Sequence, residues 1–105
     1  MNILILGAGQ VGSSTATQLA KEEDNEVTIV DIDPEKLTKL GSRVDLQTIE
    51  GNAAYPETLK QSGAETTDML IAVTSSDEVN MVACQIASTL FDTPKKIARI
   101  RAQEY

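Results

Sequence analysis

The sequence contains no histidine and no tryptophan, and its single cysteine is Cys84. Histidine is the commonest general base and the commonest metal ligand, so its absence argues against catalytic and metal-binding chemistry. One cysteine cannot form an internal disulfide, which fits a reducing compartment. We therefore expect no catalytic residue, no metal site and no reactive thiol.

Basic residues and long hydrophobic runs are also scarce. There are 9 Lys and Arg against 16 Asp and Glu, which gives a formal net charge of -7. This balance repels nucleic acid and anionic membrane surfaces. The chain begins with MNILIL and has no basic segment followed by a long apolar stretch, so we expect neither a signal peptide nor insertion into a membrane.

Short apolar runs instead alternate with helix-length amphipathic segments along the 105 residues, a pattern typical of a parallel sheet covered on both faces. Right-handed crossovers give the strand order 3-2-1-4-5. We therefore predict one three-layer, doubly wound, Rossmann-like α/β domain over residues 1–105. The predicted strands are 2–6, 26–31, 45–50, 68–73 and 96–101, and the predicted helices are 10–22, 34–43, 55–63 and 77–91.

The predicted helix 77–91 carries an apolar stripe that we expect to face the sheet. The stripe consists of Val79, Val82, Ala83, Ile86 and Leu90.

Three glycines in GAGQVG separate the first predicted strand from the first predicted helix. Their spacing is G-x-G-x-x-G: Gly7 permits a tight turn, Gly9 lets a diphosphate approach the main chain, and Gly12 lets the helix pack closely on the sheet. Backbone N–H groups near Gln10 and Val11 then face an anion at the positive end of the helix dipole. By itself such a turn also fits a purely structural corner.

The second predicted strand, EVTIVD, ends in Asp31, which follows Gly12 by 19 residues. An acid about 20 residues after the glycines is expected to bind the hydroxyls of an adenosine ribose. It would repel a 2′-phosphate, and neither Ile32 nor Asp33 supplies a compensating cation, so NAD(H) is favoured over NADP(H). The structural alternative is that Asp31 caps the next helix together with Asp33.

The other strand ends contribute further candidates, because ligands of this fold lie at the carboxyl edge of the sheet. Asn52 could offer a donor and an acceptor to an adenine edge, or it could belong to an ordinary turn. Thr74 and Ser75 could lie near a phosphate or ribose, or they could cap the following helix. Arg99 and Arg101 share one side of the last strand, where they could pair with phosphate or protect the sheet edge.

The residues resemble the nucleotide-binding domains, called KTN or RCK N-terminal domains, of the TrkA family of Trk-type potassium uptake regulators. The resemblance rests on four segments: MNILILGAGQVGSS, VTIVDIDPEKL, GNAAYPETLKQSGAETTDMLIAVTSSDEVNMVACQIA and KIARIRAQEY. It implies nucleotide contacts at Gly7, Ala8, Gly9, Gln10, Val11, Asp31, Thr74, Ser75 and Arg99. It also implies that this chain is the first part of a longer protein.

The same resemblance implies a regulatory, non-enzymatic role. Such proteins bind NAD(H), ATP or ADP, form homo-oligomers, and sit in the cytoplasm on the inner face of the membrane against a potassium channel or transporter subunit. Two rival interpretations remain open at this point. One is the cofactor domain of an NAD-dependent dehydrogenase or reductase, and the other is a nucleotide-free structural module.

Overall fold

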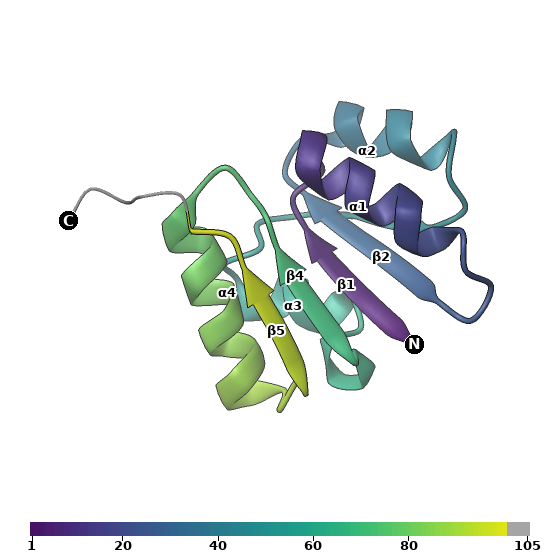
Figure 1. The fold of residues 1–105 in the computed structure, drawn as a ribbon. Helices are drawn as coiled ribbons and strands as arrows, with labels where there is room; N and C mark the ends of the chain where they lie inside the picture. Colours follow the sequence, from purple (N-terminus) through teal and green to yellow (C-terminus); the bar gives the residue numbers. More distant parts are fainter. Residues whose placement is uncertain (101–105) are drawn as a thin grey trace.

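The computed structural model describes residues 1–100 of the chain, and within them it shows a five-stranded parallel sheet in the order β3-β2-β1-β4-β5 (Figure 1). The predicted fold class and strand order are confirmed. The elements are β1 (Asn2–Leu6), α1 (Gln10–Ala20), β2 (Glu26–Asp31), α2 (Pro34–Gly41), β3 (Gln47–Glu50), α3 (Pro56–Gln61), the 3-10 turn η1 (Ala64–Thr66), β4 (Met69–Ala72), α4 (Asp77–Leu90) and β5 (Lys95–Ala98).

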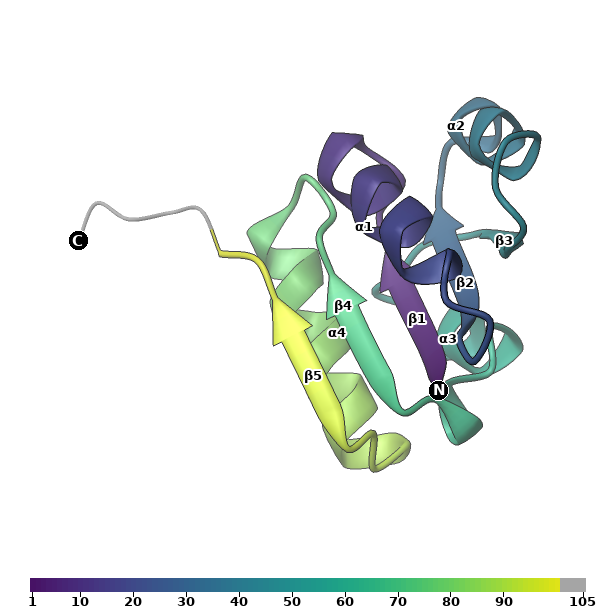
Figure 2. The same ribbon diagram turned by 45° about the vertical axis from the view of Figure 1, so that its right-hand side comes forward.

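Helices cover both faces of the sheet. Helices α1 and α2 lie on one face, and α3 and α4 lie on the other (Figures 1 and 2). The central strand β1 alternates between the two cores: Ile3 and Ile5 pack beneath α1 and α2, whereas Leu4 and Leu6 pack on the opposite side. This period of two buries a nearly continuous apolar strand on both faces, as the sequence pattern predicts.

The helix starts follow from capping chemistry. The Asp33 carboxylate accepts a hydrogen bond from the Glu35 N–H at 2.9 Å, directly before Pro34 at the start of α2. The Ser76 hydroxyl oxygen accepts one from the Val79 N–H at 3.1 Å at the start of α4. Both side chains satisfy N–H groups that a helix cannot pair internally, so these two starts agree with the prediction.

Several elements are shorter than predicted, mainly at their ends. Strand β5 stops at Ala98 instead of residue 101, because its partner β4 ends at Ala72 and the last ladder contact is the Arg99 N–H donating to the Ala72 carbonyl at 2.9 Å. Arg101 lies outside the described residues. Helix α1 ends at Ala20 and β3 begins at Gln47.

The prediction for the buried face of α4 is partly wrong. Val82 and Leu90 are 43% and 62% exposed, whereas the fully covered positions are Asn80, Ala83 and Ala87. Val79 and Ile86 of the predicted stripe pack against the core as expected, and the alanines at 83 and 87 let the helix lie close to the sheet. No helix in residues 1–100 is long and apolar enough to cross a lipid bilayer.

Candidate nucleotide-binding site

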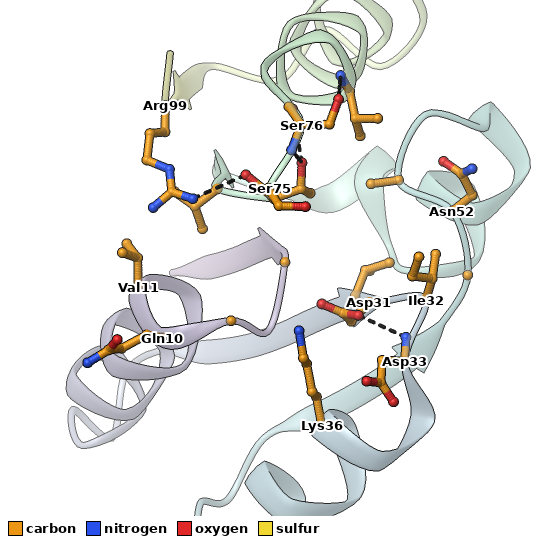
Figure 3. A pocket seen from close by; sticks show the side chains of 18 residues that line it. Gln10, Val11, Asp31, Ile32, Asp33, Lys36, Asn52, Ser75, Ser76 and Arg99 are labelled. Atoms are coloured by element: carbon orange, nitrogen blue, oxygen red, sulfur yellow. Dashed lines mark hydrogen bonds between the residues drawn. The ribbon is translucent and has the colours of Figure 1, made fainter. Parts of the chain in front are cut away.

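A cavity of about 530 Å³ opens at the carboxyl ends of the strands (Figure 3). It lies where the strand order reverses between β1 and β4, the position at which open α/β sheets bind ligands. Its volume falls in the range of small-molecule pockets. Nine of the predicted site residues line it: Gly7, Gly9, Gln10, Val11, Asp31, Asn52, Thr74, Ser75 and Arg99.

Two glycines of the first turn are required by the fold itself. Gly7 has φ +109°, and a Cβ there would lie 2.8 Å from the Val73 carbonyl oxygen. A Cβ on Gly12 would lie only 1.7 Å from the Gly7 carbonyl oxygen. Any side chain at either position would therefore collide with main chain, with or without a ligand.

Gly9 differs from the other two glycines. Its backbone is extended, with φ -72° and ψ -165°, so any residue could adopt it. A Cβ at Gly9 would meet no atom of the described part of the chain within 4 Å. Neither backbone strain nor packing against residues 1–100 explains a glycine here, and Gly9 lines the open cavity.

Helix α1 begins at this turn without neutralising groups. Its N-cap is Gly9, which supplies no side-chain hydrogen bond, and its first turn holds no acidic residue. By contrast, α2 and α4 each have a side-chain cap and an acid in the first turn. The partial positive charge and unpaired N–H groups of α1 are thus directed at the cavity, where they favour an anion.

Asp31 links two turns on the other side of the cavity. One carboxylate oxygen accepts a hydrogen bond from the Ala8 N–H at 2.6 Å, and the other accepts from the Asp33 N–H at 2.8 Å. Each oxygen keeps a second lone pair for a further donor. Ala8, which was predicted to contact the ligand, is only 4% exposed and does not line the cavity, and its N–H donates to Asp31. Capping of α2 is performed by Asp33.

Lys36 is a cavity residue that the sequence reasoning missed. It lies in the first turn of α2, three residues after the N-cap, and in Figure 3 its side chain rises toward Asp31. The expectation that no cation lies beside Asp31 considered only Ile32 and Asp33. One helical turn brings position 36 back to the same edge, so the helix period could have identified it.

Two other predicted site residues, Asn52 and Thr74, already make hydrogen bonds within their own turns. The Asn52 side-chain oxygen accepts a hydrogen bond from the Ala54 N–H at 2.8 Å, which leaves its amide N–H₂ group as the part able to serve a ligand. The Thr74 hydroxyl bonds to the Asn80 side-chain oxygen at 2.7 Å and accepts from the Ser76 N–H at 3.2 Å. Ser75 is exposed beside Thr74 at the cavity.

Arg99 borders the cavity on the side of β5. Its guanidinium donates to the Thr74 carbonyl oxygen at 3.3 Å, whereas its Nε is buried and has no hydrogen-bond partner (Figure 3). A single long hydrogen bond holds the charged end only weakly. Arg99 and the N-terminus of α1 therefore place positive charge at one end of the cavity, and Asp31 places negative charge at the other, where Lys36 also lies.

Cys84 lies apart from the cavity lining, on the partly buried side of α4. Burial raises the pKa of its thiol, and the nearby positive charge of Lys96 opposes this shift only in part. In residues 1–100, no three His, Cys, Asp or Glu side chains gather closely enough to hold a metal ion.

A doubly wound sheet with a glycine turn and a cavity at its switch point defines a Rossmann-like α/β domain. The chain belongs to the TrkA-N domain family, whose model matches residues 3–105. The resemblance seen in the sequence is thereby confirmed.

Relatives and solved structures agree with this assignment. Over 105 residues the chain is 57% identical to the Trk system potassium uptake protein TrkA of Halomonas elongata and 50% identical to the protein of that name from Vibrio alginolyticus. The alignments cover the whole chain but 23% of each relative. The fold is also similar to the NAD(P)-binding domain of an exopolyphosphatase-related protein from Archaeoglobus fulgidus, with a TM-score of 0.81, 17% identity, and coverage of 96% of this chain and 74% of the other.

Proposed function

We propose that this chain is the nucleotide-binding domain of a regulatory protein for potassium uptake, with NAD(H) as its ligand and ATP or ADP as the alternatives. The observation that carries the proposal is Gly9, where nothing in residues 1–100 requires the absence of a side chain and which borders the cavity at the uncapped start of α1. A diphosphate against the main chain explains this glycine.

The lining suggests how such a ligand would lie. The diphosphate would sit against Gly9 and the N–H groups of Gln10 and Val11, with Arg99 facing it across the cavity. The adenosine ribose would donate its hydroxyls to the remaining lone pairs of Asp31. The adenine would lie toward Asn52.

The regulatory role follows from what the domain would do with this ligand. The sequence has no histidine to act as a general base, and the lining residues offer binding groups without an arranged acid and base. Different nucleotides would stabilise different conformations of the domain and pass that difference to a partner. The name shared by the relatives points to a membrane potassium transporter subunit as the partner.

The remaining parts of the proposal follow the same family. The full-length protein would continue beyond residue 105, form a homo-oligomer, and lie in the cytoplasm at the inner face of the membrane through its partner. The family assignment does not favour the dehydrogenase interpretation. With a net charge of -7, we expect no nucleic-acid partner.

Calorimetry with NADH, NAD, ATP, ADP and NADPH, each added separately to the purified protein, tests the proposed ligand class. We expect saturable binding of at least one adenine dinucleotide or diphosphate, and loss of that binding in Gly9→Val. Absence of binding by all five compounds would leave a nucleotide-free module. Oxidation of NADH coupled to a reduced product would instead indicate an enzyme.

A further inference from the structure

The strongest observation outside the contacts assigned above is a buried amide on α4. Asn80 is 0% exposed and lies in the first turns of the helix, on the same face as Ala83 and Ala87. Removing an amide from water is costly unless its hydrogen-bonding groups are satisfied, and asparagine is a poor helix former. An apolar residue would fill such a position more simply, so its bonds must explain its presence.

Those bonds all lead to residues that line the cavity. The Asn80 side-chain oxygen accepts from the Thr74 N–H at 2.9 Å and from the Thr74 hydroxyl at 2.7 Å. Its amide nitrogen donates to the Arg99 carbonyl oxygen at 2.9 Å and to the Thr74 carbonyl oxygen at 3.3 Å. One buried side chain thus joins the main chain after β4 to the main chain after β5.

These hydrogen bonds fix the backbone of Arg99, which lies just beyond the last residue of β5. Its N–H is held by the Ala72 carbonyl at 2.9 Å, and its own carbonyl is held by Asn80. Both peptide groups flanking its Cα are therefore clamped, which sets the direction in which the side chain leaves the strand. Within residues 1–100 the guanidinium has one hydrogen bond, the 3.3 Å contact with Thr74, and its buried Nε has no partner, so the direction of the backbone has a large effect on its position.

We propose that Asn80 is a positioning residue for the nucleotide site: it holds the backbone of Thr74 and Arg99 so that the Arg99 guanidinium faces the phosphate end of the cavity. The inference rests on the proposed function and adds to it a residue that never contacts the ligand. Because the Asn80 amide bridges two strand ends, it also couples movement of Arg99 to the turn at Thr74.

The test compares the affinities for ADP and adenosine, which differ only in the diphosphate. Arg99→Ala is expected to weaken ADP binding by about tenfold and to change adenosine binding little, because a charge-assisted contact with the diphosphate is lost. Asn80→Ala is expected to reduce the ratio of ADP to adenosine affinity by at least about fivefold. If Asn80 acts through Arg99, the double variant has the same ratio as Arg99→Ala alone.

Two further variants control for effects that a general loss of stability would have on binding. Ala87→Gly truncates the same buried face of α4 without touching Thr74 or Arg99, and its ratio should equal that of the wild type. In Asn80→Ser the side chain is too short to bond to the Arg99 carbonyl, but its hydroxyl can donate to the Ser76 carbonyl one turn earlier, so the variant should fold. Its ratio of ADP to adenosine affinity should be as low as that of Asn80→Ala.

The side-chain amide resonances of Asn80 in the wild-type protein provide a measurement without substitution. We expect slow solvent exchange, and a shift on adding ADP that adenosine does not produce. An unchanged affinity ratio in Asn80→Ala or Asn80→Ser, multiplicative effects with Arg99→Ala, or an identical spectral response to both ligands would overturn this inference. Failure of the wild type to bind ADP and the other nucleotides would instead overturn the proposed function.

Discussion

Replacing Gly9 and Gly12 separately should divide the glycine turn into a ligand-binding part and a folding part. At Gly9, valine can adopt the existing backbone, and its Cβ has open space around it. The expected cost is that of a poorer N-cap, about 1 kcal/mol of the free energy of unfolding. This is small beside the roughly 5–15 kcal/mol typical of a domain. Gly9→Val should therefore fold.

Its effect on binding should be large, because the new side chain occupies the space in which the diphosphate would meet the main chain. Each tenfold loss of affinity corresponds to about 1.4 kcal/mol, and the loss of several N–H contacts should exceed tenfold. Calorimetry with the best nucleotide ligand measures this loss. Wild-type affinity in a folded Gly9→Val protein would refute the assignment of the turn.

Gly12→Ala is the matched variant. Its Cβ would lie 1.7 Å from a main-chain oxygen that cannot rotate away, so the helix or the turn must move by roughly 1 Å or more. We expect a loss of about 3 kcal/mol in the free energy of unfolding. Thermal and denaturant unfolding without ligand measure it. A Gly12→Ala protein as stable as the wild type would show that the geometric argument is wrong.

Three further predictions concern the other end of the cavity and α4. NADH should bind more tightly than NADPH because the Asp31 carboxylate repels a 2′-phosphate, and equal affinity for both in the wild type would contradict this. Lys36→Gln should widen the difference in affinity by about threefold, because an exposed cation near the ribose contributes modestly to binding of the 2′-phosphate. Asp31→Asn should lower the free energy of unfolding by about 1–3 kcal/mol even without nucleotide, because an N–H₂ group replaces one acceptor of a main-chain N–H. The control is Asp33→Asn, which retains a good N-cap. Equal stability of the two variants would count against the bridging role of Asp31. Burial raises the pKa of Cys84, so its thiolate should form only at higher pH than in the unfolded chain. Iodoacetamide should therefore alkylate Cys84 more slowly in the folded protein. A faster rate in the folded protein would show that the pKa is shifted in the opposite direction.

Local sequence determined much of this protein. Alternating apolar runs and helix-length segments were enough for the strand order, because right-handed crossovers leave few arrangements of such a chain. The glycine spacing and the acid at the end of the second strand located the cavity, since both lie at strand ends that the topology brings together. The helix starts at residues 34 and 77 were predictable because capping chemistry is confined to three or four residues.

Only the tertiary structure showed which atoms make each of these residues necessary. The spacing assigned a steric role to each glycine, but only the structure shows that a Cβ at Gly7 or Gly12 would strike main-chain atoms of Val73 or Gly7, whereas a Cβ at Gly9 would meet open space. Lys36 and Asn80 escaped notice because one reaches the cavity from a neighbouring helix and the other is a polar residue on a face judged by its aliphatic positions. The role of Asn80 depends on contacts with Thr74 and Arg99, and its contact with Arg99 joins residues distant along the chain, which local periodicity does not contain.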